Sequence, residues 1–525
     1  MAKLNKINFT IFLYSLLVPV LFFFVSIYTI NDYGETTDEK FDQHIGEFYY
    51  NNWTKKGVKG LEERFIPLQR NYGPFFDVIV VASNDFLNKK TQIIKNPVAS
   101  YHFPVIIIST ITLWVVFVFA YLNWGLIPAL ISAISLVLLP RFIGDSQNNL
   151  KDTPLMAFFS LTLLLYYLGE ARKKVIYYFL GGIFLGLTYS IKINALIIIP
   201  IIVTWHLLKG GFIKGLPRLI VFSSLSLITA LLTILIFWPY YQYNTLQRFA
   251  ETYFTFKNHV WDEYILYLGQ FYRGHEVPWH YPIVMFGVTT PIFYLFLILL
   301  GIFISAYLIV KKTEHKSPLL FLLLWLIFPP VTQVISKAPT YDGIRHFLTV
   351  LPPLSILIGF TIWKLGLFLR KFGKKGGYLF FLYILIIVVG YLQILLTDIR
   401  IHPYQIVFFN QLTGGVKGAK ERFDLDYWGQ SLKEAAEWIN SNLPSGSRIW
   451  LTLPFTHHFP VDGDRFVLTD QNPDYKVNLI RGMLKDWDPD DDYLYPKRKP
   501  IYSLKVEGGE ILQIFKLTDR VVNTK

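Results

Sequence analysis

Residues 8–30 of the sequence, NFTIFLYSLLVPVLFFFVSIYTI, form an uncharged apolar stretch, and Thr36-Thr37-Asp38-Glu39 follows it closely. About 20 apolar residues in a helix cross the hydrocarbon core of a bilayer, so this stretch is long enough to span a membrane. It is too long for the core of a typical signal peptide, and no convincing cleavage site follows it, which favours a retained signal anchor. The sequence therefore predicts a membrane protein with an acidic pair just beyond its first span.

The composition extends this prediction to most of the chain. Of the 525 residues, 53% are hydrophobic and 17% aromatic, and no cysteine is present, which excludes disulfides, thiolate metal sites and a cysteine nucleophile. Apolar segments recur at lengths that soluble domains do not carry. They predict about eleven spans, at residues 8–30, 102–122, 124–140, 154–168, 175–190, 193–208, 217–239, 282–310, 317–336, 347–368 and 378–398.

The basic residues indicate how these spans are oriented. The formal net charge of +13 is by itself also compatible with nucleic-acid binding. With eleven spans and a cytoplasmic N-terminus, however, each basic cluster falls in a cytoplasmic segment, as the positive-inside rule requires. The charge therefore explains topology and disfavours a nucleic-acid partner. The clusters are Lys3 and Lys6; Arg172, Lys173 and Lys174; Lys209, Lys214 and Arg218; Lys311, Lys312 and Lys316; and Arg370, Lys371, Lys374 and Lys375.

This membrane topology divides the chain into a membrane domain at 1–398 and an extracytoplasmic domain at 399–525. Functional residues usually collect in loops held by a rigid scaffold, so we expect the chemistry on the outer face. Its loops are 31–101, 141–153, 240–281 and 337–346. The tail has an amphipathic segment at 431–442, a strand pattern at 448–453, and a hairpin pattern at 501–506 and 511–517 around Gly508-Gly509, which together predict an α+β domain.

Acidic residues distinguish the first two outer loops. Asp38, Glu39 and Asp42 lie in a segment with helical spacing, which is either a solvated amphipathic helix on the membrane or a reactive site. Asp152 precedes Thr153-Pro154 at the start of a span, where capping of the helix is the alternative to a binding role. Asp145 follows a glycine in mid-loop and has no such explanation. A divalent metal is a further alternative for these oxygen ligands, although their spacing matches no recognised metal site.

Cationic residues lie near the same membrane boundary. Lys192 separates two apolar runs and either snorkels to the interface or pairs with an anion inside the bundle. Arginine and histidine near a helix start suit a phosphate or diphosphate. The alternatives are an aromatic belt for Trp279 and Tyr281 and an ion pair between Arg345 and Asp342. The candidate cations are Lys192, Arg273, His280, Arg345 and His346.

Taken in order, these motifs resemble a known group of enzymes. They are the pair Asp38-Glu39, Pro140-Arg141 with Asp145 and Lys151-Asp152-Thr153-Pro154-Leu155, Gly186-Leu187-Thr188 with Lys192, Pro278-Trp279-His280-Tyr281-Pro282, and Arg345-His346 with Pro352. The chain is similar over roughly residues 8–400 to the GT-C membrane glycosyltransferases, specifically the protein O-mannosyltransferase and lipid A aminoarabinose transferase group. His402-Pro403-Tyr404-Gln405 and Asp426-Tyr427-Trp428-Gly429-Gln430-Ser431 resemble a segment of bacterial members of this group.

The resemblance implies a polytopic, mainly α GT-C fold in a bacterial inner membrane. It implies transfer of a sugar from a polyprenyl-phosphate donor to a hydroxyl acceptor on the outer face, with inversion at the anomeric carbon. It makes Asp38 the general base and Glu39 the residue that orients it or shares its site. Lys192, Arg345 and His346, with Arg273 and His280, would bind the donor phosphate, and Asp145 and Asp152 would position acceptor or sugar hydroxyls.

The chain also departs from the family pattern. Lys40-Phe41 stands where the aminoarabinose branch tends to place an arginine, and the large inserted domain of eukaryotic mannosyltransferases is missing from the first outer loop. The sugar therefore stays open, and so does the acceptor, which is a protein, a glycan or a lipid. A polytopic transporter and an O-antigen ligase or polymerase are the alternative functions, although we find no internal repeat of the kind that many transporters contain.

Overall fold

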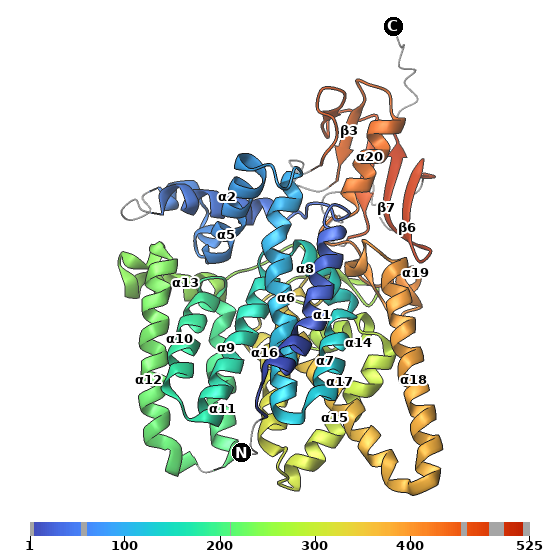
Figure 1. Ribbon diagram of the computed structural model, residues 1–525. Coiled ribbons are helices and arrows are strands. Elements are labelled where there is room, and N and C mark those ends of the chain that lie inside the picture. Colours follow the sequence, from blue (N-terminus) through green and yellow to red (C-terminus); the bar gives the residue numbers. More distant parts are fainter. Residues whose placement is uncertain (1–4, 54–59, 211, 453–458, 482–497, 518–525) are drawn as a thin grey trace.

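The protein, seen here in a computed structural model, is a bundle of membrane-length helices with a small sheet at one end (Figure 1). The structure describes residues 5–53, 60–210, 212–452, 459–481 and 498–517. In Figure 1 the N-terminus lies at the lower end of the bundle, and the C-terminal sheet lies at the upper end, which we call the sheet end.

Most of the predicted spans are long helices. Within the described part of the chain, eight helices are long and apolar enough to cross a membrane, or nine when one bent pair is counted as a span. They form a multi-pass membrane bundle. These helices are α1 (Phe9–Tyr28), α6 (Pro97–Trp124), α9 (Asp152–Arg172), α12 (Phe212–Phe237), α15 (Ile292–Val310), α16 (Lys316–Ser336), α17 (Leu351–Leu369) with its 3-10 entry turn Arg345–Val350, and α18 (Gly373–Arg400).

The other predicted spans are shorter or broken. The helices α7 (Leu126–Val137), α10 (Val175–Tyr189) and α11 (Ile198–Lys209, preceded by the 3-10 turn Ile193–Ile197) fall below membrane length. The single span predicted at 282–310 is wrong, because the structure divides it into α14 (Tyr281–Thr289) and α15. Proline disfavours the helical conformation in the residue before it, and Thr290, which precedes Pro291, is extended.

The loop predicted at 141–153 is also largely helical. Residues Pro140–Asn148 form α8, which bends by 65° from α7. Pro140 occupies the first helical position, where its missing N–H costs nothing, so the chain restarts as a helix in a new direction. Asp145 is therefore a helical residue and does not lie in mid-loop.

Two glycines let α10 pack closely on α12. A Cβ atom at Gly182 would overlap Thr229 Oγ1 and the Ser226 carbonyl, and one at Gly186 would lie 2.6 Å from the Ala230 carbonyl oxygen. Small residues four apart let two membrane helices approach until their backbones touch. This contact holds the α10 end that precedes Lys192.

The longer connecting segments gather at the sheet end, whereas the turn between α17 and α18 lies at the opposite end (Figure 1). The helix α2 (Glu39–Asn52), near α5 (Phe75–Asn84), lies across the end of the bundle (Figure 1). The remaining short elements are α3 (Leu61–Arg64), α4 (Pro67–Arg70), the π-helical turn Asp85–Lys90, the 3-10 turns Pro239–Gln242, Arg370–Phe372 and Gln405–Val407, α13 (Thr245–Lys257), the hairpin β1 (Tyr264–Tyr267) and β2 (Gln270–Arg273), and α19 (Gly415–Ala419).

The C-terminal α/β region comprises α20 (Leu432–Asn442) and a five-stranded sheet of order β4-β3-β5-β7-β6. The strand β3 is parallel to β4 and β5, whereas β7 is antiparallel to β5 and β6. The predicted amphipathic helix, the strand at 448 and the hairpin around Gly508 are all present. The strands are β3 (Arg448–Leu451), β4 (Val467–Leu468), β5 (Tyr475–Leu479), β6 (Tyr502–Val506) and β7 (Gly509–Lys516).

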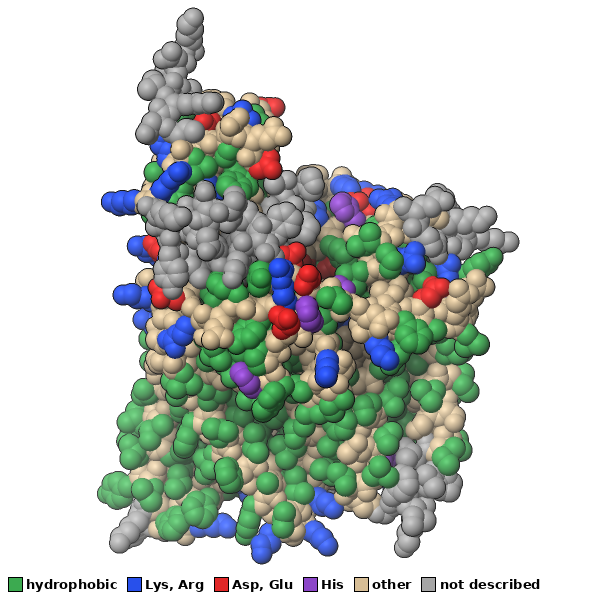
Figure 2. Space-filling view, turned by 180° about the vertical axis from the view of Figure 1, so that it is seen from behind, with side chains coloured by type: hydrophobic (Ala, Val, Ile, Leu, Met, Phe, Trp, Pro, Cys, Tyr) green, Lys and Arg blue, Asp and Glu red, His purple; other side chains and the backbone are tan. Residues whose placement is uncertain are grey.

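The surface agrees with a membrane position for the bundle. Figure 2 shows a broad band of hydrophobic side chains, with Lys and Arg along its lower edge. Acidic, basic and histidine side chains gather above the band around a hollow. This hollow lies at the sheet end.

Replacing Gly182 with alanine tests the close contact between α10 and α12. The added methyl group overlaps Thr229 and Ser226, so we expect Gly182→Ala to lower the free energy of unfolding by about 1–3 kcal/mol. Thermal unfolding in detergent measures this change. The matched control is Gly377→Ala in α18, where nothing lies within 4 Å of the new Cβ atom, so this variant should be at least as stable as the parent.

Candidate functional site

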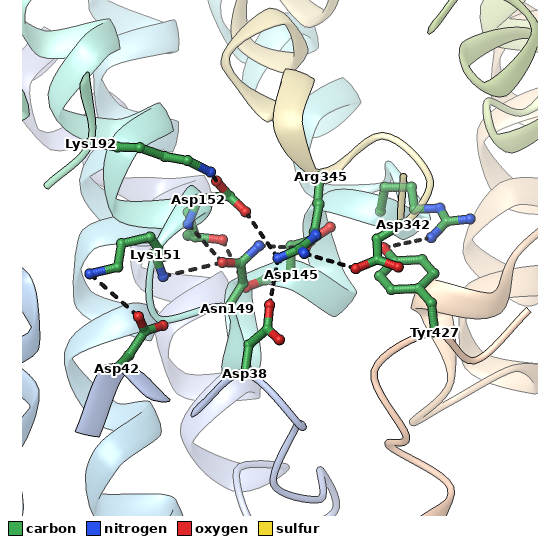
Figure 3. A network of polar contacts seen from close by, with 12 residues as sticks. Asp38, Asp42, Asp145, Asn149, Lys151, Asp152, Lys192, Asp342, Arg345 and Tyr427 are labelled. Carbon is green, nitrogen blue, oxygen red and sulfur yellow. Dashed lines mark hydrogen bonds and ion pairs between the residues drawn. The ribbon is translucent and has the colours of Figure 1, made fainter. Parts of the chain in front are cut away.

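A cavity of about 460 Å³ opens at the sheet end. Its wall joins the start of α2, the loop between α8 and α9, the loop after α10, the segment before α17 and one residue of the C-terminal α/β region. Acids and bases alternate around it, as Figure 3 shows. The charged lining residues are Asp38, Asp42, Lys151, Asp152, Lys192, Glu263, Asp342, Arg345 and Arg481, and His259, His346, Phe41, Tyr72, Trp261 and Tyr341 lie between them.

Asp38 is the most accessible acid in the ion pairs around this cavity. It precedes the first residue of α2, and its side chain is 47% exposed. Arg345 Nη1 donates to Asp38 Oδ2 at 2.6 Å. A carboxylate at a helix N-terminus is also stabilised by the helix dipole. Asp38 therefore faces the cavity from a position that solvent can reach.

Arg345 contacts several acids at once. Its Nη2 lies 2.8 Å from Asp342 Oδ2, and its Nη1 lies 3.9 Å from Asp152 Oδ2. The guanidinium carbon also lies 5.1 Å from the ring centre of Tyr341 and 5.3 Å from that of Trp428. A planar guanidinium suits such multiple contacts better than an ammonium group does. The predicted ion pair with Asp342 is present, but it is one of several.

Lys192 pairs with an anion inside the bundle and does not snorkel. Its Nζ donates to Asp152 Oδ1 at 2.6 Å, and both residues are buried. Asp152 lies in the first turn of α9, and its carboxylate is used by Lys192 and not by a capping hydrogen bond. His346 lines the same cavity. The sequence thus predicted three residues that the fold brings to one cavity: Lys192, Arg345 and His346.

A second buried ion cluster lies beside Asp38. Lys151 Nζ donates to Asp77 Oδ2 at 2.5 Å and to the Gly73 carbonyl at 3.1 Å, and it lies 3.4 Å from Asp42 Oδ1. Burial raises the pKa of Asp77 to about 6 and raises the pKa of Asp42 well above its usual range, although Lys151 opposes both shifts. Asp38 and Asp42 share one face of α2, as their spacing predicts, and both line the cavity.

Glu39 and Asp145 lie behind the cavity wall. Glu39 accepts a hydrogen bond from Thr36 N at 2.7 Å and contacts His102 Nε2 at 3.0 Å. Burial raises the pKa of this carboxyl, while His102 lowers it. Asp145 is buried and accepts from Asn149 Nδ2 at 2.8 Å. Neither acid lines the cavity, so their contacts support the loops that do.

Arg273 and His280 do not join the cluster. Arg273 stacks on Tyr264, with 3.8 Å from the guanidinium carbon to the ring centre, and His280 Nδ1 lies 2.6 Å from the Tyr267 hydroxyl. Neither residue lines the cavity. The hairpin β1–β2, which the sequence analysis missed, supplies both aromatic partners and holds these side chains away.

Two charged cavity residues, Lys151 and Arg481, were not identified as site residues from the sequence. Lys151 and its partner Asp77 are 74 positions apart, and Arg481 and Asp342 are 139 apart, so no local pattern connects them. The only local signal for Lys151 was its position directly before Asp152. Arg481 follows β5 and had no signal, since its role depends on how the C-terminal α/β region is placed.

A side compartment extends the cavity towards the apolar band. It measures about 330 Å³ and shares Tyr72, Lys192, His259, Tyr341 and His346 with the main cavity. Its other wall contains Leu196, Ile197 and residues of α16. A separate apolar groove of about 690 Å³ lies between α14, α15, α16 and α17. Lys192 thus lines both the main cavity and the side compartment, whereas Asp38 lines the main cavity alone.

The donor groups of the cavity do not suit a metal. Among the described residues, no group of three or more histidine, aspartate or glutamate side chains has the arrangement of a metal site. Asp38, Asp42, Asp152 and Asp342 instead contact lysine or arginine. We therefore derive no reaction step through a metal ion.

Comparison with known proteins identifies the fold. A family model described as dolichyl-phosphate-mannose-protein mannosyltransferase matches residues 86–243. The structure of ArnT from Cupriavidus metallidurans bound to undecaprenyl phosphate is similar, with a TM-score of 0.52 and 14% identity over 96% of this chain and 97% of that chain. The apo state of that ArnT has a TM-score of 0.53, also at 14% identity, with the same coverage. No curated protein sequence matches significantly.

A more distant structure has the same architecture. The apo oligosaccharyltransferase from Archaeoglobus fulgidus has a TM-score of 0.50 and 14% identity, over 82% of this chain and 58% of that chain. These similarities show that the chain has the GT-C fold of membrane glycosyltransferases. They confirm the resemblance that the ordered motifs indicated.

Replacing Lys151 with methionine tests the buried ion cluster. The variant leaves Asp42 and Asp77 buried without their cation, which should lower the free energy of unfolding by about 3–5 kcal/mol. A carboxyl whose pKa is raised in the folded state makes the protein less stable as the pH rises. The loss of stability in Lys151→Met should therefore shrink as the pH is lowered from about 8 to about 5. Thermal unfolding across this pH range measures it. Lys40→Met removes a partly exposed pair with Glu35 and should change stability by less than about 1 kcal/mol at every pH.

Proposed function

We propose that this protein transfers a sugar from a polyprenyl-phosphate carrier to a hydroxyl acceptor on the outer face of the bacterial inner membrane. The observation that carries the proposal is the pairing of accessible Asp38 with Arg345 in the main cavity. Lys192 lines both this cavity and the side compartment. In this arrangement a base and a cationic phosphate site face one another at the level where the apolar band ends.

Asp38 is the general base of the proposed reaction. The acceptor hydroxyl gives its proton to the Asp38 carboxylate while its oxygen attacks the anomeric carbon. The bond from that carbon to the phosphate oxygen breaks, and polyprenyl phosphate leaves with the bonding electrons. One displacement of this kind inverts the anomeric centre and needs a base on one side and charge stabilisation on the other.

The leaving phosphate is bound by Lys192 and Arg345, with His346 beside them. Lys192 and His346 belong to both compartments, and Arg345 lies between Lys192's partner Asp152 and Asp38. Charge-assisted hydrogen bonds from lysine and arginine are well suited to phosphate oxygens. The similar ArnT structure contains undecaprenyl phosphate, which supports a carrier of this class. Asp152 and Asp42 are placed to accept hydrogen bonds from sugar or acceptor hydroxyls.

The orientation of the chain follows from the same proposal. The described lysines and arginines at the end of the bundle opposite the sheet favour a cytoplasmic location for that end. The sheet end, with the cavity, then faces outward. The sugar is a hexose or a pentose, and the acceptor is a protein, a glycan or a lipid.

Replacing Asp38 with asparagine tests the base. The amide keeps the side-chain shape but accepts no proton, so transfer should fall by about 10²–10⁴-fold. Folding should persist, because Asp38 is half-exposed and Arg345 retains its bond to Asp342. Mass spectrometry of envelope glycans and glycoproteins, with and without the gene, identifies the product to be followed. The matched control is Glu47→Gln on the same helix, which does not line the cavity. Normal transfer by Asp38→Asn, or substrate movement without a glycosylated product, contradicts the proposal.

Replacing Lys192 with glutamine tests the phosphate site. Loss of the ammonium group removes one charge-assisted contact, so affinity for undecaprenyl phosphate should fall by about tenfold or more. Native mass spectrometry or a thermal-shift titration with undecaprenyl phosphate measures this loss. Lys257→Gln is the control, because that exposed lysine borders the side compartment but not the main cavity. An equal loss in both variants would place the phosphate elsewhere.

A further inference from the structure

The C-terminal α/β region and the segment that leads into it contact the loops of the proposed catalytic pair from two directions. Trp428 lies in the segment between the membrane bundle and α20, and its carbonyl accepts a hydrogen bond from Thr37 N at 3.0 Å. Its ring faces the Arg345 guanidinium at 5.3 Å. One residue thus fixes the backbone next to Asp38 and also packs against the partner of Asp38.

Arg481 extends this contact into the cavity. It follows β5, its side chain is 8% exposed, and it is the one described residue of α20 and β3–β7 or their connections that lines the cavity. Its Nη2 donates to Asp342 Oδ1 at 3.2 Å, and its Nη1 donates to the Tyr427 carbonyl. Arg481 therefore joins the sheet to the loop that precedes Arg345.

These contacts complete a chain of alternating charges. Arg481 binds one oxygen of Asp342, Arg345 binds the other oxygen at 2.8 Å, and Arg345 then binds Asp38 at 2.6 Å. The chain contains two cations and two anions (Figure 3 shows its labelled members). Asp342 is almost fully buried, and a buried carboxylate that loses one of its cations is strongly destabilised.

The backbone on both sides of this chain is held in place. Asp342 and Gly343 both have positive φ, at 55° and 66°, and Gly343 N donates to the Tyr281 hydroxyl at 3.0 Å. On the other side, Leu425 N donates to the Ile480 carbonyl at 3.2 Å, which ties the Trp428 segment to the strand end that bears Arg481. The sheet can therefore transmit its position to Arg345 through Asp342.

We propose that Arg481 is a positioning residue for sugar transfer, and that the C-terminal α/β region thereby completes the catalytic centre. Arg481 neutralises one oxygen of Asp342, so Arg345 divides its charge between Asp342 and Asp38. Without Arg481, the uncompensated Asp342 carboxylate draws Arg345 towards itself. Arg345 then no longer holds Asp38 in its working position. This role rests on the proposed function.

The test compares variants of the full chain in detergent. Arg481→Gln removes the charge, Arg481→Lys keeps it, and Arg481→Gln with Asp342→Asn removes both members of the first ion pair. Arg465→Gln is the matched control, because Arg465 makes its bonds to Asn440 and Ser445 within the C-terminal α/β region and does not line the cavity. Thermal unfolding identifies any variant that fails to fold.

Transfer of the sugar identified in the envelope provides the first measurement. We expect kcat to fall at least tenfold in Arg481→Gln, with KM for the acceptor changed less than threefold. Arg481→Lys should keep at least a third of the parent kcat, and the double variant should exceed the single variant, because it contains no uncompensated carboxylate. A merely structural bond would make the double variant no better than the single one. That result, or a kcat for Arg481→Gln within twofold of the parent, overturns the proposal.

Hydrogen exchange provides a measurement that does not need activity. In Arg481→Gln, peptides covering 36–39 and 341–346 should exchange at least threefold faster than in the parent and in Arg465→Gln. Faster exchange confined to 425–428 and 475–481 overturns the proposal. If the parent protein transfers no sugar, the proposed function fails, whereas this exchange pattern still decides whether Arg481 holds the Arg345–Asp38 pair.

Discussion

The site depends on one arginine that is shared among three acids. Arg345 binds Asp38 and Asp342 directly and lies near Asp152, and these acids come from parts of the chain far apart in sequence. Ion pairs at an exposed surface contribute little to stability. Where burial makes an unpaired charge costly, however, they hold the paired side chains in one arrangement. The start of α2, the start of α9 and the segment before α17 are therefore held in one geometry. The accessible oxygen atoms of Asp38 face the cavity as a result.

The sequence predicted the membrane helices well, because apolar length and basic flanks are local signals. It failed where helices bend. Pro291 divides a long apolar segment, and Pro140 turns a short polar segment into α8, but the same residue type also occurs inside unbroken helices such as α16, which contains Pro329 and Pro330. Whether a proline ends a helix depends on the partners of the freed backbone groups. Those partners are set by tertiary packing and cannot be read from one segment.

The sequence also predicted part of the site. Asp38, Asp152, Lys192, Arg345 and His346 were identified by their position next to spans, and the fold brings them to one cavity. Arg273 and His280 occupy similar positions in sequence, yet a hairpin with weak local signals holds them elsewhere. Arg481 was missed for the opposite reason, since it follows a strand far along the chain and reaches the site only through the placement of a whole sheet.

The bend between α7 and α8 also has a consequence for biogenesis. The helix α8 turns polar residues into a buried layer, where Arg141 donates to the Tyr427 hydroxyl at 3.2 Å and Gly144 lies against the backbone of Ile406. The residues that cover this layer are translated more than two hundred positions after α8. Until they arrive, the nascent bundle holds an uncovered polar surface at the end that bears α8. In the proposed orientation these residues must also cross the membrane before they can cover it, so assembly of the bundle is coupled to export of the tail.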